Sequence, residues 1–468
     1  MEMLSMYLVR NGEKPLYEQL YTYIKKEIIA GNITYGTKLP SKRKLAEFLD
    51  ISKHTVETAY EQLLAEGYIE SVPRKGYFVL SREDLEYMER KPFKPVEESE
   101  EKEEDAVLYD FHPGRIDTEN FPFEQWRKYT NKIIARENRH LLLIGDHRGE
   151  YELRKEICRY LFQARGVHCR PEQIVVGAGM ETLLQQLIML FDKNTVYGVE
   201  DPGYHVISQL LKKYGADIYP LAVDEEGVNA DEINKTNVDV VYVTPSHHFP
   251  YGSILPVNRR AKLLQWAAES DNRYIIEDDY DSEFRYSGKT IPSLQSMDQK
   301  QKVIYLGTFS KSFVPSIRIS YMVLPEKLLR KFRKELAFYQ CSVSRIDQAV
   351  LTEFMREGEF EKHLNRMRKV YRRKLKKVLE FLKPYEKELG VISTYSGFYI
   401  VLVVRNGMNG EELVKKAMDY NLKVYPVSSY RIAKKKERFP EIVLGFAGIP
   451  EEELGKALSL LLTSWGIL

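Results

Sequence analysis

The chain has 468 residues, which is too long for one ordinary hydrophobic core, so we expect two or more domains. Hydrophobic residues make up 43% of it and charged residues 29%, a composition that is ordinary for a soluble globular protein. The formal net charge is only +2, which excludes an argument for nucleic-acid binding from the charge of the whole chain. Any affinity for DNA must come from local patches of charge.

The sequence predicts neither a membrane span nor a targeting segment. No apolar run is long enough to cross a bilayer, and residues 1–10 lack a basic flank that leads into an apolar stretch. The cysteines are Cys158, Cys169 and Cys341, an odd number with no C-x-x-C pair. We therefore expect no disulfide framework, no metal site and a reducing, cytoplasmic location.

Three helices and a hairpin are predicted before residue 81. Apolar residues recur every four positions between Pro15 and Ala30, which predicts a first helix with one apolar face. Ser41 can cap a second helix, and Ser52 can cap a third helix that runs from Lys53 to Glu66. In the second helix, we expect the side chains of Leu45, Phe48 and Leu49 to face inward.

The start of the third helix is the expected DNA reader, because a recognition helix enters the major groove with its N-terminal residues. Lys53 can reach a phosphate or a guanine edge, and Arg43 in the preceding helix can reach the backbone or a groove. Two strands, 68–72 and 77–80, enclose a basic tip that contains Lys75 and suits a wing. The alternative is a generic three-helix module whose lysines form a solvated face.

Composition changes between residues 81 and 107, where prolines and the acidic run 97–105 replace the apolar pattern. Such a segment cannot bury enough surface to offset its ordering entropy. We predict a winged helix-turn-helix domain at 1–80, a charged linker at 81–107 and a larger domain at 108–468. The alternative for the linker is an exposed charged helix within one continuous domain.

The larger domain alternates short, nearly all-apolar runs with helical patterns, which predicts an α/β fold with a mainly parallel sheet flanked by helices. The predicted strands are 174–176, 238–243, 274–276 and 303–306. Helical patterns lie between them, for example at 182–190 and 259–268.

Four features of this domain point to one phosphorylated aromatic aldehyde. Backbone amides of a glycine turn that contains Gly179 and Met180 can bind phosphate at the start of a helix. Lys311 follows a predicted strand and can form a Schiff base with an aldehyde. Three further side chains can hold phosphate oxygens, namely Thr308, Ser310 and Arg318.

The third feature is the acidic strand end Glu277-Asp278-Asp279, where one carboxylate could pair with a protonated pyridine nitrogen. Adjacent acids could equally bind a metal, but no His or Cys beside them completes a metal site. Tyr280 could hydrogen-bond the phenolic oxygen of the ring. The fourth feature is the pair of more distant aromatic residues Tyr204 and His247, which could contact the ring from its sides.

Segments 39–43, 51–56, 59–60 and 65–68 resemble the winged-helix head of the GntR family of bacterial regulators. The features around Lys311 resemble the fold-type I aminotransferases, and the combination resembles the MocR/GabR subfamily of GntR regulators over nearly the whole chain. For the head, the resemblance implies contacts to operator DNA by Arg43, Ser52, Lys53, His54, Thr55 and Gly76. Lys75, at the tip of the wing, completes this predicted set.

For the body, the resemblance implies a pyridoxal phosphate (PLP) cofactor. Lys311 becomes the Schiff-base residue and Asp278 the partner of the pyridine nitrogen, although the local spacing leaves Glu277 and Asp279 open. Further cofactor contacts fall on Tyr204, Tyr280, Thr308, Ser310 and Arg318. The resemblance also implies a sensory body without catalytic residues and a homodimer that exchanges its heads head-to-tail.

Several positions depart from the family pattern. Lys53 stands where arginine is usual, which weakens bidentate recognition of guanine. Gly448, in the segment 442–449 that we predict as a strand, stands where aminotransferases keep a carboxylate-binding arginine. Val206 replaces a second arginine used by relatives that sense γ-aminobutyric acid (GABA), and Met180 replaces a hydroxyl residue.

We therefore expect a PLP-dependent transcriptional regulator whose signal is PLP or a PLP–amine adduct, as in the PdxR branch that controls vitamin B6 synthesis. One alternative is a regulator that senses an amino acid or amine, such as GABA, through another group, for example Arg431. A second is an active aminotransferase, against which Gly448 argues, although residual half-reactions stay open. A third is a scaffold that has lost its cofactor.

Overall fold

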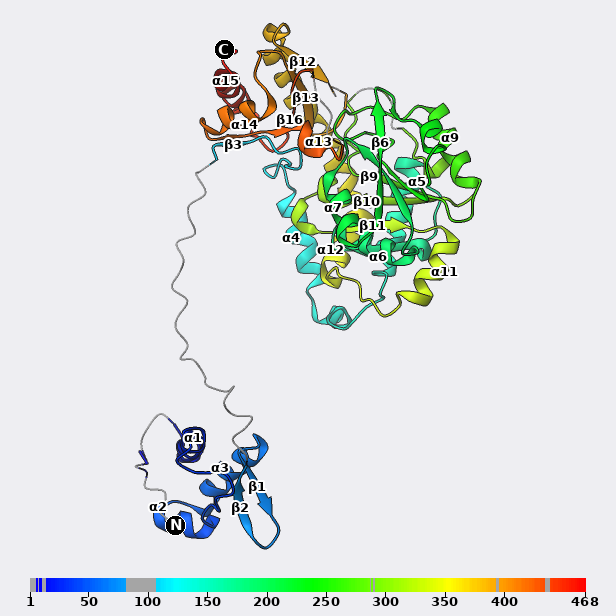
Figure 1. Cartoon of the computed structure of the whole chain (residues 1–468). Helices are drawn as coiled ribbons and strands as arrows, with labels where there is room; N and C mark the ends of the chain where they lie inside the picture. Colours follow the sequence, from blue (N-terminus) through cyan, green and yellow to red (C-terminus); the bar gives the residue numbers. More distant parts are fainter. Residues whose placement is uncertain are drawn as a thin grey trace. The chain divides into compact units, whose positions relative to one another are not determined.

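The computed structural model describes residues 6, 8–10, 14–80, 107–286, 288, 291–392, 395–433 and 438–468. The chain divides into two compact units, 1–102 and 103–468, which we call the head and the body (Figure 1). All of the predicted linker except its last residue lies outside the described residues. The linker and the domain limits at 80 and 108 therefore stay predictions.

The head consists of three helices followed by a two-stranded antiparallel sheet. Its elements are α1 (Leu16–Ile29), α2 (Lys42–Leu49), α3 (Lys53–Ala65), β1 (Ile69–Val72) and β2 (Gly76–Val79). Both predicted caps are present: Ser41 accepts a hydrogen bond from the Lys44 amide at 3.3 Å, and Ser52 accepts one from the Thr55 amide at 3.1 Å. These caps fix where α2 and α3 begin.

The core of the head lies between its three helices. The fully buried side chains include Leu20, Ile24, Leu45, Val56, Ala59, Tyr60 and Leu63. The prediction that Phe48 faces inward is wrong, because its side chain is 45% exposed while Ala46 is buried. The neighbours Leu45 and Ala46 define the buried face of this two-turn helix, and Phe48 falls on its flank.

The hairpin pairs Ile69 with Val79 and Val72 with Gly76. The turn between the strands needs two positive backbone angles, with φ of 63° at Arg74 and 110° at Gly76. Glycine meets this need without strain at its position. Lys75, between them, is exposed at the tip, as expected for a wing.

The body is built on an eight-stranded sheet in the order β4-β11-β10-β9-β8-β5-β6-β7 (Figure 1). Its strands are β4 (Ile174–Gly177), β5 (Val196–Asp201), β6 (Asp217–Asp224), β7 (Gly227–Val228), β8 (Val240–Val243), β9 (Tyr274–Asp279), β10 (Val303–Thr308) and β11 (Ser320–Val323). The five central strands from β10 to β6 are parallel, whereas β11 and β7 pair antiparallel with their neighbours. The predicted mainly parallel sheet is confirmed.

Alternate residues of the central strands enter different hydrophobic clusters, which explains why the strands are apolar throughout. In β9, for example, Ile276 packs on the side of α6 (Met180–Leu190), α7 (His205–Lys213) and α11 (Glu326–Glu335). Its neighbour Ile275 packs on the other side, with α8 (Ala230–Ile233) and α9 (Val257–Ala268). Helices therefore cover both faces of the sheet.

A third cluster joins the sheet to the remaining helices and to a second, four-stranded sheet in the order β12-β13-β16-β15. The helices are α4 (Phe123–Ile133), α5 (Tyr151–Arg165), α10 (Phe309–Ser312), α12 (Arg345–Arg356), α13 (Glu359–Leu382), α14 (Gly410–Met418) and α15 (Leu454–Ser464). The strands of the second sheet are β12 (Leu389–Ile392), β13 (Tyr399–Val404), β15 (Tyr425–Pro426) and β16 (Glu441–Gly445). The predicted strand 442–449 therefore ends at Gly445, and Gly448 lies in the turn that follows.

Short elements complete the body. The strands β3 (Tyr109–Asp110) and β14 (Leu422–Lys423) form a parallel pair. The 3-10 turns are η2 (Arg136–Leu142), η3 (Pro171–Gln173), η4 (Gln295–Met297), η5 (Pro315–Ile317), η6 (Lys383–Tyr385) and η7 (Val427–Tyr430). Within the described ranges, none of the helices has the length and apolarity needed to cross a membrane.

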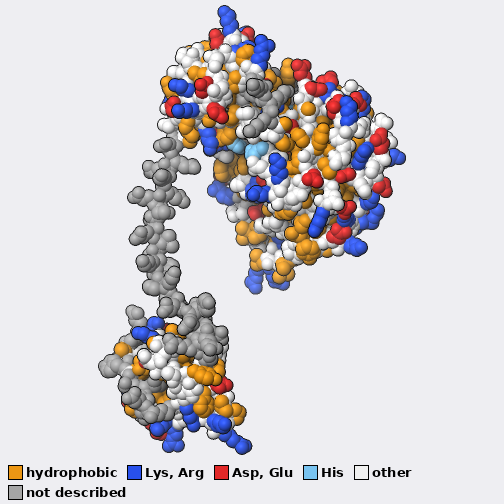
Figure 2. Space-filling view, viewed as in Figure 1, with side chains coloured by type: hydrophobic (Ala, Val, Ile, Leu, Met, Phe, Trp, Pro, Cys, Tyr) orange, Lys and Arg blue, Asp and Glu red, His pale blue; other side chains and the backbone are white. Residues whose placement is uncertain are grey.

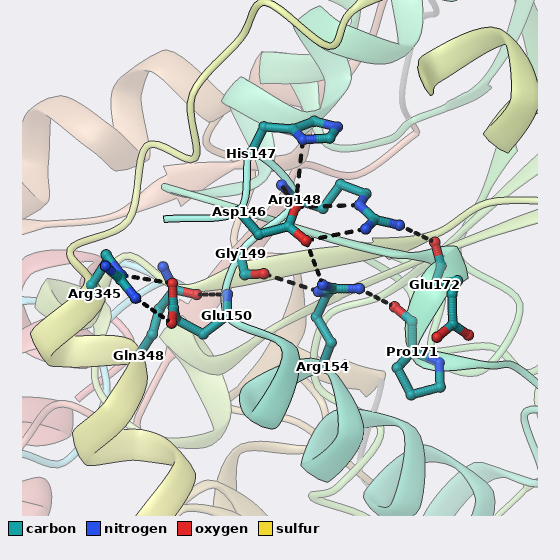
Figure 3. Close-up of polar contacts among 10 residues, drawn as sticks. All are labelled: Asp146, His147, Arg148, Gly149, Glu150, Arg154, Pro171, Glu172, Arg345 and Gln348. Atoms are coloured by element: carbon teal, nitrogen blue, oxygen red, sulfur yellow. Dashed lines mark hydrogen bonds and ion pairs between the residues drawn. The ribbon is translucent and has the colours of Figure 1, made fainter. Parts of the chain in front are cut away.

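A polar network holds the segment before α5 against the sheet (Figure 3). Arg154 donates to Asp146 at 2.9 Å and to the Gly149 carbonyl at 2.9 Å, while Arg345 of α12 binds both oxygens of Glu150 at 2.8 and 3.0 Å. Gly149 approaches β4 so closely that a Cβ there would lie 2.7 Å from a β4 side chain. The network thereby fixes the strand that leads into the glycine turn.

A buried ion pair joins the N-terminal segment of the body to its C-terminal sheet. Lys374 of α13 donates to Asp117 at 2.7 Å and to the Ala447 carbonyl at 2.9 Å, and both charged side chains are almost fully buried. Removing one partner of such a pair leaves an uncompensated charge in the interior.

Lys374→Met should therefore lower the free energy of unfolding of the body by about 3–5 kcal/mol, measured by urea denaturation. Lys376→Met is the matched control on the same helix. Its 3.7 Å contact with Glu380 is largely exposed, so its loss should cost less than about 1 kcal/mol. Equal effects of the two substitutions would contradict a stabilising role for the buried pair.

Candidate functional site

The carboxyl ends of several strands of the large sheet meet at one edge. The register pairs Leu306 with Asp278, Thr308 with Ser320, and Ser320 with Gly177. The acidic strand end, the hydroxyl side chains and the glycine turn therefore lie on neighbouring strands. In parallel α/β sheets this edge is where ligands bind.

Lys311 lies in α10, the single helical turn that follows β10. Its Nζ atom donates a hydrogen bond to the Gly114 carbonyl at 2.7 Å. Burial lowers the pKa of the Lys311 ammonium to about 8, against the opposing effect of the Asp281 carboxylate. A substantial fraction of this amine is thus neutral, and therefore nucleophilic, near neutral pH.

The glycine turn and Arg318 form a cradle for an anion. Gly179 precedes α6 with a φ of 91°, and Met180 is the first residue of the helix. The Arg318 guanidinium, which donates to Glu181 at 2.8 Å, occupies the space where a Cβ at Gly179 would lie. The helix N-terminus and the guanidinium both favour a phosphate at this place.

Two hydroxyl side chains from the predicted phosphate set differ in their contacts. Thr308 accepts a hydrogen bond from the Ser310 amide at 3.1 Å and lies 2.8 Å from the Ser320 hydroxyl. The Ser310 hydroxyl is buried and has no hydrogen-bond partner within the described part of the chain. Ser310 is therefore free to contact a bound group.

The three acids of β9 point to alternate sides of the sheet and have different partners. Glu277 accepts two backbone amides at 2.7 and 2.8 Å, and Asp279 forms a buried ion pair with Arg165 at 2.6 Å. Asp278 accepts a hydrogen bond from the Tyr242 hydroxyl, and its other oxygen is buried without a partner among the described residues. Asp279 also keeps one buried oxygen without a partner, but its charge is already paired with Arg165, which favours Asp278 as the partner of a ligand cation.

The electrostatics of Asp278 support the same choice. Burial raises the pKa of Asp278 to about 7, and the carboxylates of Asp279, Asp281 and Glu277 add to this shift. A protonated ring nitrogen placed against Asp278 would lower the pKa of this carboxyl again, because an opposite charge favours the ionised carboxylate.

The predicted aromatic contacts have different surroundings. Tyr204 precedes α7 and is 43% exposed, and its pKa is raised by burial and by the nearby carboxylates of Glu181 and Asp278. Tyr280 donates to the His247 carbonyl at 3.0 Å. The His247 ring itself stacks on Tyr280 and Tyr399 and lies 2.8 Å from Asp281, so it belongs to a stack of protein side chains.

Sequence reasoning missed residues that reach the site from distant segments. The Gly114 carbonyl, which holds Lys311, lies 197 positions away and has no local motif. Tyr242 lies in the apolar run of β8 and gives no signal apart from its polar hydroxyl. Asp281 follows the predicted acidic run, and its contact with His247 was not anticipated.

Two arginines are relevant to position 448, where Gly448 replaces the carboxylate-binding arginine of the aminotransferases. Arg431 donates to the Tyr251 hydroxyl at 2.8 Å and lies 3.7 Å from Glu441, so it is already engaged. Arg115 was not predicted, yet its Cβ lies only 2.6 Å from where a Cβ at Gly448 would be. The stem of Arg115 thus fills the space at this position, and its guanidinium pairs with Asp110 at 2.8 Å.

The residues present fit a phosphorylated aromatic aldehyde with a basic ring nitrogen. An amine with a lowered pKa, an anion cradle and a carboxylate with a free oxygen are available, at Lys311, Gly179 with Arg318, and Asp278. No cluster of three or more metal-ligating side chains occurs in the described ranges.

The predicted DNA-reading residues of the head lie at the start of α3, in α2 and at the hairpin tip. Arg43 and Lys53 are exposed, as is His54, and Ser52 and Thr55 share a hydrogen bond between their hydroxyls at 2.8 Å. Arg43 pairs with Glu47 at 2.9 Å, and Lys42 pairs with Glu57 at 2.6 Å. A phosphate that binds Arg43 must therefore compete with Glu47.

Comparisons with known proteins match both parts of the chain. Residues 16–79 match the bacterial regulatory proteins of the gntR family, and residues 111–461 match aminotransferase class I and II. The chain is 44% identical to the HTH-type transcriptional regulator YdeL of Bacillus subtilis over 99% of this chain and 100% of that protein.

Two further regulators are similar to the chain. It is 31% identical to the probable rhizopine catabolism regulatory protein MocR of Rhizobium meliloti, over 97% of this chain and 94% of that protein. It is 32% identical to the pyridoxine biosynthesis regulator PdxR of Corynebacterium glutamicum, over 76% of each. The body has the fold of the kynurenine aminotransferase of Pyrococcus horikoshii, with a TM-score of 0.69, 23% identity and coverage of 77% of this chain and 91% of that one.

The lowered pKa of Lys311 predicts how the cofactor-free protein reacts with added PLP. Because only the neutral amine attacks an aldehyde, the rate constant should rise about tenfold from pH 7 to pH 9 and then level off. Stopped-flow absorbance gives this profile, with N-acetyl-lysine as the reference amine. A protein profile that kept rising past pH 10, as the reference does, would contradict the lowered pKa.

The head predicts a salt-dependent loss of affinity. Arg43→Ala and Lys53→Ala should each weaken binding to operator DNA and reduce the slope of log Kd against log salt by about one. Fluorescence anisotropy measures this slope. Lys26→Ala removes the same charge from the exposed face of α1 and should leave the slope almost unchanged. The same reduction in all three variants would mean that the contact is not specific to α2 and α3.

Proposed function

Because the chain belongs to the MocR/GabR subfamily of GntR-family transcriptional regulators, we propose that it is a PLP-dependent regulator that responds to PLP or to a PLP–amine adduct. The head binds operator DNA through α3 and the hairpin. The body binds the cofactor at the edge of the large sheet and reports its state. Such a protein works in the cytoplasm, where its DNA is.

The observation that carries the proposal is the surroundings of Lys311. Its amine is partly buried and donates to the Gly114 carbonyl, and desolvation lowers its pKa to about 8. Lys302 likewise donates to a carbonyl and has a pKa lowered by burial, so these features alone do not distinguish Lys311. What distinguishes Lys311 is its place directly after β10, the strand next to the one that ends in Asp278 and Asp279.

Each residue of the site has a role in this proposal. When bound, PLP supplies an aldehyde that captures an amine and a ring that withdraws electrons. Lys311 binds the aldehyde, and Asp278 holds the proton of the ring nitrogen. Gly179, Met180, Thr308, Ser310 and Arg318 hold the phosphate, while Tyr204 and Tyr280 orient the ring, and the His247 stack supports Tyr280.

PLP itself is the favoured signal because the site lacks a fixed guanidinium for a substrate carboxylate at two positions, Gly448 and Val206. A buried carboxylate left without its partner costs about 2–5 kcal/mol. The similarity to PdxR, whose name refers to pyridoxine biosynthesis, supports control of PLP synthesis. Because the site lacks a fixed guanidinium at positions 448 and 206, we assign no catalytic residue and expect no sustained aminotransferase turnover.

A second candidate is favoured by Arg115, whose stem packs against Gly448. If its guanidinium exchanged Asp110 for a ligand carboxylate, the signal would be an amino acid bound to the cofactor rather than the cofactor alone. The same site would then bind the ligand in both candidates. They would differ only in whether PLP alone or an amino acid bound to PLP changes the affinity for DNA.

We further propose that two copies form a dimer with exchanged heads. The end of η2 and the two residues after it support a covered surface on the body, since Leu142, Leu143 and Ile144 are 77%, 69% and 81% exposed. Adjacent large apolar side chains at such exposure are unusual on a monomer and are typical of an interface.

Titration of PLP into the protein bound to its own upstream DNA tests the proposal. We expect PLP to change the Kd for DNA by about 5–150-fold, the usual range of allosteric coupling. Lys311→Ala should bind DNA as before, but it should lose both the visible absorption of bound PLP and the response.

Lys327→Ala, an exposed lysine of α11, is the matched control and should behave as the wild type. A DNA affinity that is indifferent to PLP, yet responds to an amine once PLP is present, would overturn the PLP signal in favour of the second candidate. Unchanged absorption in Lys311→Ala would overturn the site itself.

A further inference from the structure

Two of the three cysteines lie side by side although no local motif joins them. Cys158 is on α5, and Cys169 is in the extended segment between α5 and η3. Their Sγ atoms are 3.5 Å apart, and the Cys158 thiol donates a hydrogen bond to the Cys169 carbonyl at 2.8 Å. Both thiols are free, and a disulfide would require the sulfur atoms to approach by only about 1.5 Å.

The thiol pair lines a cavity of about 710 Å³ between α5 and the segment that follows it. Three cationic side chains share the lining: Lys155, Arg159 and Arg170. Both thiols are only partly buried, so a small solute can reach them. Arg159 pairs with Glu156, and Arg170 pairs with Glu326. The reactivity of the two thiols therefore comes from their contact with each other rather than from these cations.

The two thiols differ in pKa, which suits one to act first as the nucleophile and the other to react second. The interaction with Cys169 lowers the pKa of the Cys158 thiol, whereas the interaction with Cys158 and burial raise the pKa of the Cys169 thiol. Cys158 is therefore the nucleophile of the pair, and Cys169 is the thiol in reach of it. Cys341 lies elsewhere, beside Val176 and Gln348, and has no second cysteine near it among the described residues.

We propose that Cys158 and Cys169 form a modification site that is oxidised to a disulfide by a hydroperoxide. The Cys158 thiolate attacks one peroxide oxygen, the O–O bond breaks, and Cys158 becomes a sulfenic acid while hydroxide leaves and is protonated to water. The Cys169 thiol then attacks the Cys158 sulfur, forms the S–S bond and releases a second water. One hydrogen peroxide is reduced to two waters, and two thiols lose one hydrogen each.

The disulfide would join α5 to the segment that runs through η3 into β4. That strand ends in the glycine turn, so the modification acts on the element that supports the anion cradle. A dithiol reductant should restore the two thiols, because exchange through a mixed disulfide reverses the bond. The proposal depends only on the thiol pair and is independent of the effector.

The test treats the full chain with hydrogen peroxide and follows free thiols with a chromogenic disulfide reagent. The wild type should lose two of its three thiols, its mass should fall by about 2 Da, and digestion without reductant should give one peptide that links Cys158 to Cys169. Dithiothreitol should restore all three thiols.

Matched variants separate the pair from the third cysteine. Cys341→Ser should still lose two thiols at the wild-type rate. Cys158→Ser should react at least about tenfold more slowly, because the lower-pKa thiol is gone, and Cys169→Ser should stop at the sulfenic acid or its further oxidation products. Retention of all thiols, a link that includes Cys341, or oxidation of Cys158 without a cross-link in the wild type would overturn the proposal.

Discussion

The proposed function of the body depends on how poorly one amine is solvated. Lys311 emerges from the end of a central strand into a site where its charged form is poorly solvated, and its hydrogen bond to Gly114 satisfies the amine whether it is charged or neutral. The surrounding elements of the body place Lys311 next to the other residues of the site. The parallel strands bring the acids and the glycine turn to the same edge, and the segment 111–118 closes over it from the start of the body.

That segment is itself positioned by a second buried charge. Lys374 joins Asp117 to the Ala447 carbonyl, so the part of the chain that carries Gly114 is tied to the turn that carries Gly448. The two lysines illustrate opposite solutions to burial. Lys374 has a carboxylate 2.7 Å away, whereas Lys311 has a carbonyl and a lowered pKa.

Local patterns were sufficient for much of this description. The serine caps at Ser41 and Ser52 fix two helix starts by hydrogen bonds within three residues, and apolar runs mark strands buried on both faces. The sequence predictions were wrong or incomplete where packing between distant segments determines the position of a side chain. Phe48 fits a helical pattern but lies beside the buried face. Only the ion pair between Asp279 and Arg165 favours Asp278 over Asp279 as the proposed partner of the ring nitrogen. The contacts of Tyr242 and Gly114 join segments that no sequence window contains, and the two cysteines, 11 positions apart, meet only because the chain folds back after α5.

The ion pairs of the head have a consequence for how the protein would search a genome. Arg43 and Lys42 already pair with glutamates, so a contact with a phosphate exchanges one ion pair for another, and the nearly neutral chain adds no long-range attraction. We therefore expect weak non-specific binding, which would leave more of the protein available for its operator. Only a duplex that places a phosphate or a base edge correctly offsets the loss of these ion pairs. The free energy needed to break them therefore contributes to selectivity.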